Sequence, residues 1–125
     1  MGFTNWKGFQ KLAQALVSES DEAMLRSAIN RSYYAAFQMS VCFAEAHYRF
    51  IRDRMGNDHK RILEALRDGG DRTIKGAGRK LERLRNNRGK ADYDERINIG
   101  QPLAQISVQW ADEIIQSLEG WLPNP

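Results

Sequence analysis

Hydrophobic residues along the chain recur at the spacing of an α-helix, and no segment alternates apolar and polar residues long enough to indicate a strand. Capping residues and glycine or proline breaks separate the helical stretches. The pattern therefore predicts an all-α fold, a four- to five-helix up-and-down bundle that forms a single domain over residues 1–125. The expected helices cover residues 5–17, 20–50 and 57–67, a basic stretch after 71 that ends before the polar segment 86–100, and residues 102–118.

The long helix expected over 20–50 carries two separate apolar stripes when its residues are placed at about 100° per residue. The broader stripe must face a core and includes Leu25, Ile29, Ala36, Phe43 and Phe50. The second stripe lies nearly opposite and includes Asn30, Tyr34, Phe37, Val41 and Tyr48. Two apolar faces require two partners. The helix is therefore either central in the bundle or one side of a homodimer interface, and periodicity does not choose between these arrangements.

Charge is sorted along the chain although the formal net charge is only +3. Residues 52–90 carry 13 Lys and Arg against 6 Asp and Glu. This bias suits a polyanion such as RNA, but a solvated helix face with mixed charges gives the same pattern. The two glycines at 76 and 78 are expected to weaken the first turn of the basic helix.

Cysteine usage and hydropathy limit the class of protein. The single cysteine, Cys42, cannot form an intrachain disulfide, and no cysteine or histidine pair has zinc-ligand spacing, so we expect no metal and no cofactor. No stretch approaches the roughly 20 apolar residues of a membrane span, and the first residues lack a signal-peptide core. We expect a cytoplasmic protein without membrane contact.

Two short motifs carry a resemblance to a known family. The segment INRSYYAAFQ on the long helix, followed later by LRNNRGKADYDERI, resembles the HEPN superfamily, the small helical domains of prokaryotic toxin–antitoxin and defence systems. The similarity spans about residues 21–118. It implies a homodimer with helices meeting near a cleft, and RNA as the target. In the nuclease members of that family, an arginine followed four to six residues later by a histidine forms a metal-independent active site.

The late motif departs from the family pattern at the position expected for histidine. Arg85 and Asn86 resemble its beginning and Tyr93 resembles the tyrosine that follows, but Ala91 and Asp92 stand where the histidine is expected. An aspartate is ionised at neutral pH and makes a poor acid catalyst.

An arginine, four residues and a histidine do occur in RMGNDH, from Arg54 to His59. The string precedes the family's usual position, and such short spacings arise often by chance in an arginine-rich region. We nevertheless select His59, with Arg54 and Arg85, as the catalytic candidates, because His47 falls on the core side of the long helix.

The leading interpretation is a HEPN-type dimeric, RNA-directed protein of a toxin–antitoxin or defence system, acting as a metal-independent ribonuclease. Arg31, Arg85 and Arg88 are its candidate phosphate ligands. The candidate interface or cleft residues are Asn30, Tyr34, Phe37, Asp92 and Tyr93. The alternative is a non-catalytic HEPN-like module that binds a partner protein, such as an antitoxin or a small nucleotidyltransferase, or a nucleotide. A third interpretation is a helical dimer in which Arg31, Tyr34 and Asp92 form a purely structural network. Arg88 and Asp92 can equally form a structural ion pair at a helix end.

Overall fold

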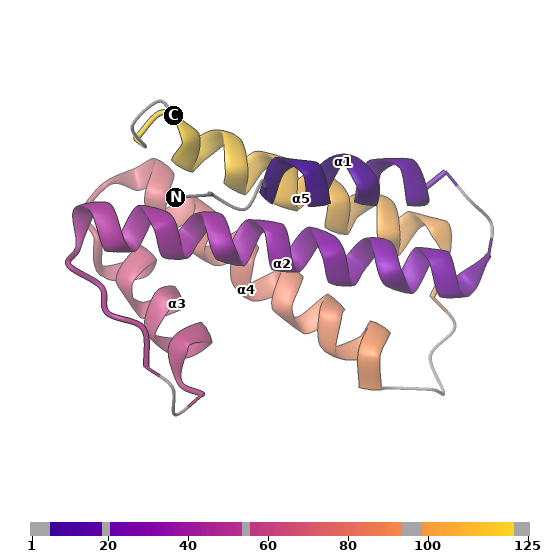
Figure 1. The fold of residues 1–125 in the computed structure, drawn as a ribbon, viewed down its shortest axis with the longest axis horizontal. Helices are drawn as coiled ribbons and strands as arrows, with labels where there is room; N and C mark the ends of the chain where they lie inside the picture. Colours follow the sequence, from indigo (N-terminus) through magenta and orange to yellow (C-terminus); the bar gives the residue numbers. More distant parts are fainter. Residues whose placement is uncertain (1–5, 19–20, 54–55, 94–98, 122–125) are drawn as a thin grey trace.

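The computed structural model describes residues 6–18, 21–53, 56–93 and 99–121, and these residues form helices and connections without a strand (Figure 1). The prediction of an all-α bundle is confirmed. None of the described helices is long and apolar enough to cross a bilayer. In Figure 1, α2 and α5 run in the direction opposite to α1 and α4. The helices are α1 (Trp6–Leu16), α2 (Glu22–His47), α3 (Asp58–Asp68), α4 (Arg72–Tyr93) and α5 (Gln101–Glu119).

Aspartate side chains begin two of these helices. The Asp21 carboxylate accepts hydrogen bonds from the backbone N–H groups of Ala23 at 2.8 Å and Met24 at 3.3 Å. Asp71 accepts the equivalent pair at the start of α4, from Thr73 and Ile74. Each carboxylate thereby satisfies amides that have no partner inside the first turn. The predicted cap at Asp71 is confirmed, whereas the predicted cap at Ser20 lies outside the described residues.

The long helix α2 is central and packs against all four of the others. Phe37 and Val41, from its second apolar stripe, are buried in the main core of the monomer. Part of the second stripe thus finds partners within one chain, whereas its members Asn30, Tyr34 and Tyr48 are exposed. The main core also contains residues of α3, α4 and α5, among them Ile62, Leu66, Leu81, Leu84 and Ile114.

Two predicted helix ends differ from the structure. Helix α2 ends at His47 rather than near residue 50, because Arg49 adopts a backbone φ of 55°, which a continuing helix does not allow. Helix α4 continues through the segment expected to be a polar connection. Asn87 and Ala91 are buried there, and together with Leu84 they extend one helical stripe. The Asn87 amide also donates to Ser107 Oγ on α5 at 3.1 Å.

A glycine allows α3 to lie close to α4. A Cβ added at Gly78 would lie 3.0 Å from the Cβ of Leu66, which is fully buried on α3. At Gly76, two residues earlier, an added Cβ would find only the end of the Arg79 side chain, at 3.8 Å. Gly78 thus provides the space into which α3 packs. The first turn of α4 is helical although glycines follow it at 76 and 78.

Candidate functional site

Helices α2 and α3 bring His59 against two aromatic rings. The imidazole lies parallel to the Phe37 ring, with centroids 4.1 Å apart and planes inclined by 10°. It also stacks beside Tyr33, at 5.5 Å and the same inclination. The Tyr33 hydroxyl and His59 Nδ1 are hydrogen-bonded, and Tyr33 is 1% exposed. These contacts fix the position and the plane of the histidine ring.

The second nitrogen of His59, Nε2, is not used in the contact with Tyr33. The side chain is half-buried, and its hydrogen bond within the described part of the chain uses Nδ1. Nε2 is therefore the ring nitrogen that remains for a ligand.

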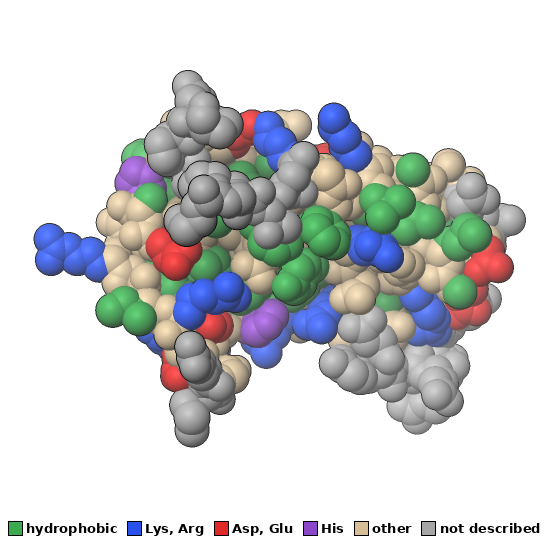
Figure 2. Space-filling view, in the orientation of Figure 1, with side chains coloured by type: hydrophobic (Ala, Val, Ile, Leu, Met, Phe, Trp, Pro, Cys, Tyr) green, Lys and Arg blue, Asp and Glu red, His purple; other side chains and the backbone are tan. Residues whose placement is uncertain are grey.

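Arginines of α4 complete the cluster. The Arg88 guanidinium lies over the Tyr33 ring, 5.3 Å from its centroid, and Arg88 Nε donates to Asn30 Oδ1 at 3.1 Å. Arg85, one turn earlier on the same face of α4, acts electrostatically on both Tyr33 and His59. Figure 2 shows a histidine surrounded by hydrophobic side chains and by Lys or Arg side chains. We call Asn30, Tyr33, Phe37, His59, Arg85 and Arg88 the histidine cluster.

The surroundings change the acidity of both hydrogen-bonded groups. Burial lowers the pKa of His59 below its usual value near 6.5, and the positive charges of Arg85 and Arg88 lower it further. The imidazole is therefore neutral at pH 7. Burial raises the pKa of the Tyr33 phenol to about 12, although the same two arginines oppose that rise. Tyr33 thus keeps its proton at every physiological pH.

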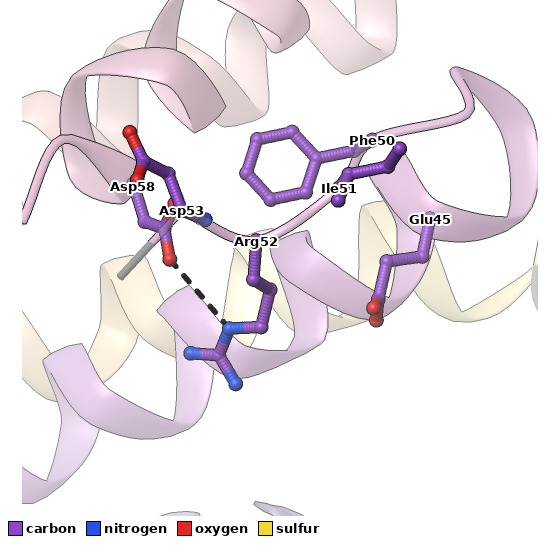
Figure 3. Close-up of a pocket in the computed structure, with 6 residues that line it drawn as sticks. All are labelled: Glu45, Phe50, Ile51, Arg52, Asp53 and Asp58. Carbon is purple, nitrogen blue, oxygen red and sulfur yellow. Dashed lines mark hydrogen bonds and ion pairs between the residues drawn. The ribbon is translucent and has the colours of Figure 1, made fainter. Parts of the chain in front are cut away.

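Polar contacts hold the first turn of α3, which carries His59. The mostly buried Asp58 carboxylate accepts hydrogen bonds from the Asp53 backbone N–H at 2.8 Å and from Arg61 Nη1 at 3.2 Å, and it pairs with Arg52 at 3.7 Å (Figure 3). The Arg61 guanidinium lies 4.6 Å from the centroid of the Phe50 ring. These contacts join the connection after α2 to the start of α3.

The pocket in Figure 3 lies at these contacts between the connection after α2 and the start of α3. His59 is not among its lining residues. Its charged side chains have both signs. The lining residues are Glu45, Phe50, Ile51, Arg52, Asp53 and Asp58.

The other predicted site residues lie outside the histidine cluster or are not fully described. Arg31 lies about 160° around α2 from Tyr33, where Arg31 Nε donates to Ser27 Oγ at 3.1 Å, so it does not join the histidine cluster. Tyr34 packs against α1 and is described below. Arg54 lies outside the described residues. The backbone of Asp92 and Tyr93 belongs to α4, but their side chains are not described, so the expected ion pair between Arg88 and Asp92 stays a prediction.

The expectation that His47 faces the core is wrong. His47 is exposed at the last turn of α2, and its Nε2 donates to the Trp121 backbone carbonyl at 2.6 Å. Its ring packs on Phe43 and Trp121. Because α2 ends at His47, the side chain is not covered by neighbouring helices as it would be in the middle of the helix.

Sequence reasoning missed Tyr33 as a member of the site. Tyr33 and His59 are 26 residues apart and belong to different helices, so no spacing rule connects them. The available signal was a buried tyrosine on a helix face, whose hydroxyl requires a hydrogen-bond partner.

Within the described ranges, no group of three or more His, Cys, Asp and Glu side chains is arranged to hold a metal ion. Comparisons with protein-family models, curated proteins and solved structures found no match.

Proposed function

We propose that the chain is a HEPN-type, dimeric, RNA-directed protein of a toxin–antitoxin or defence system, and that it cleaves RNA at the histidine cluster without a metal ion. One observation carries the proposal. The half-buried His59 ring is fixed by Tyr33 and Phe37 through Nδ1 and stacking, and the charges of two arginines of α4 act on it. A positioned, neutral imidazole beside guanidinium groups combines a proton acceptor with ligands for a phosphate.

The proposed chemistry is attack of a ribose 2′-hydroxyl on the adjacent phosphorus. The reaction uses the tautomer with its proton on Nδ1, in which His59 donates to the Tyr33 hydroxyl oxygen and Nε2 takes the proton of the 2′-hydroxyl. The new bond joins the 2′ oxygen to phosphorus, and the bond to the 5′ oxygen breaks. The proton held on Nε2 passes to that leaving oxygen. The products are a 2′,3′-cyclic phosphate and a 5′-hydroxyl end.

The arginines have a separate role in this reaction. Negative charge accumulates on the phosphate oxygens as the 2′ oxygen attacks, and guanidinium groups stabilise that charge through paired hydrogen bonds. The Arg88 guanidinium lies 5.3 Å from the centroid of the Tyr33 ring, and the charges of both Arg85 and Arg88 lower the pKa of His59. They also keep the imidazole in its neutral, basic form at pH 7.

The resemblance to the family gives the proposal further support, with one change of position. In this chain the histidine comes from the start of α3, whereas the late position on α4 holds Ala91, which is buried against Leu25 and Ile99. A histidine at that buried position would face the core. The arginine of the late motif and the histidine of RMGNDH would then act together through tertiary contact rather than through adjacency in sequence.

The test is cleavage of mixed cellular RNA in the presence of EDTA by the wild-type protein, His59→Ala and the matched control His47→Ala. We expect wild type and His47→Ala to cut RNA and leave cyclic phosphate ends, with a loss of about 100-fold or more for His59→Ala. Circular dichroism establishes that each variant is folded. Intact RNA with wild-type protein, or equal cleavage by His59→Ala, would overturn the proposal in favour of a non-catalytic binding module.

A further inference from the structure

A second aromatic group lies about 100° around α2 from Tyr33, in contact with α1. Tyr34 is 45% exposed, and its ring lies 5.3 Å from Trp6 and 6.0 Å from Phe9, both in edge-on arrangements. Trp6 and Phe9 are half-buried and pack against each other at 5.5 Å. We call these three residues the aromatic surface. They hold one another in place and leave much of Tyr34 open to solvent.

The aromatic surface continues into the histidine cluster along α2. Asn30 is exposed and lies four residues before Tyr34, on the same face of the helix and about 6 Å along its axis. Asn30 Oδ1 also holds Arg88, whose guanidinium covers Tyr33. A path over the surface therefore leads from His59 through Arg88 and Asn30 to Tyr34.

Positive charge lies on both sides of this path. Arg88 is tied to Asn30 on one side, and Arg31 lies three residues before Tyr34 on the other. Figure 2 shows hydrophobic side chains gathered over α1 and the middle of α2, with Lys or Arg side chains on either side of them and a histidine close by. Exposed rings between guanidinium groups match the alternation of bases and phosphates in a nucleic acid strand.

We propose that the aromatic surface is a base-stacking subsite for single-stranded RNA, next to the position where the strand meets His59. This inference rests on the proposed function and specifies its substrate class. Bases of a single strand are free to stack on aromatic side chains, whereas bases of a duplex are stacked on one another.

A second copy of the chain fits the aromatic surface less well than RNA does. A two-fold contact centred on Tyr34 would gather four guanidinium groups around one apolar patch, with a large desolvation cost.

The test is binding of a fluorescein-labelled 2′-O-methyl oligoadenylate of ten residues, which lacks the reactive hydroxyl. Its affinity is measured by fluorescence anisotropy at fixed salt, for the single strand and for its duplex with oligouridylate. We expect the wild-type protein to prefer the single strand. Tyr34→Ala should weaken single-strand binding about tenfold, whereas Tyr34→Phe, which keeps the ring, should stay within about twofold of wild type. Duplex binding should not change in either variant.

Each other outcome contradicts the inference. Equal single-strand affinity for Tyr34→Ala and wild type would overturn the subsite. A lower molar mass for Tyr34→Ala than for wild type in light scattering would assign the surface to a second copy of the chain. Because the oligonucleotide cannot be cleaved, this assay is independent of catalysis. Failure of the subsite alone leaves cleavage by His59 intact, whereas absence of binding by wild type overturns the RNA function as well.

Discussion

The two histidines of this chain lie in similar packing arrangements and in different chemical surroundings. Each ring packs against aromatic side chains, and each makes a hydrogen bond, His47 to the backbone carbonyl of Trp121 and His59 to the hydroxyl of Tyr33. His47 is exposed at the end of α2 and joins it to Trp121, two residues after the end of α5. His59 is half-buried and lies near two arginines of α4.

The comparison shows that the neighbours of a histidine determine what it can do. The hydrogen bond of His47 uses Nε2 and connects two parts of the backbone, which is a structural role. The hydrogen bond of His59 uses Nδ1 and not Nε2, while burial and positive charge lower the pKa of the ring. His59 combines a fixed ring, a second ring nitrogen outside that hydrogen bond and arginines as ligands for an anion, and this difference can be tested variant by variant.

The largest expected effect concerns the positive charge around His59. Arg85→Ala should lower kcat/KM for RNA cleavage by about 100-fold, because it removes a group that stabilises the developing charge on the phosphate. Arg83→Ala is the matched control. Arg83 is also exposed on α4 but points about 160° away from Arg85, so we expect nearly unchanged activity. Equal losses in the two variants would mean that net charge, and not the histidine cluster, is responsible.

A smaller effect is expected from the hydrogen bond that orients His59. Tyr33→Phe keeps the buried ring and its stacking but removes the hydroxyl, and kcat should fall about tenfold, equivalent to about 1.4 kcal/mol, while KM stays the same. Tyr34→Phe, at the adjacent position about 100° around α2, should leave kcat unchanged. Steady-state kinetics with a defined RNA substrate measures both. An unchanged kcat in Tyr33→Phe would show that Tyr33 does not position His59.

The smallest expected effect concerns the packing that places α3. Gly76→Ala should raise the free energy of unfolding by about 0.5–1 kcal/mol, because alanine favours a helix and the added methyl group has space. Gly78→Ala should be less stable than Gly76→Ala by about 1 kcal/mol or more, because its methyl group meets Leu66. Chemical denaturation measures both. Equal stabilities would indicate that α3 moves away easily, and the ring environment of His59 should then differ in Gly78→Ala.

Much of the fold follows from periodicity, because amphipathic helices depend on local sequence. The stripe of Phe37 and Val41 indicated a second buried face on α2, and Asp71 indicated the start of α4. Periodicity did not predict the end of α2, which depends on the backbone of Arg49. It also missed the last turns of α4, because the segment around Asn87 and Ala91 is polar overall and only a few of its positions are buried.

The candidate site was less accessible to sequence reasoning. Motif spacing identified His59 and Arg85 separately, but chance matches are frequent for such short strings. The contact between Tyr33 and His59 depends on how α3 packs against α2 and α4, which involves Gly78 and the contacts of Asp58. These are tertiary contacts between residues far apart in the sequence, and no local pattern records them. The family resemblance placed Arg31 together with Arg85. That Arg31 lies apart from the histidine cluster became visible only in the structure.

The most direct test of the account is a titration of the two histidine rings by NMR, with and without the 2′-O-methyl oligoadenylate. His59→Ala and His47→Ala assign the resonances. Without RNA, His59 should titrate below its usual pKa near 6.5, because of burial and the charges of Arg85 and Arg88. With RNA, phosphate beside the ring should raise the pKa of His59 and shift its signals, while the chemical shifts of His47 at a given pH should not move. Signals of His59 that do not respond to the oligonucleotide would contradict the account.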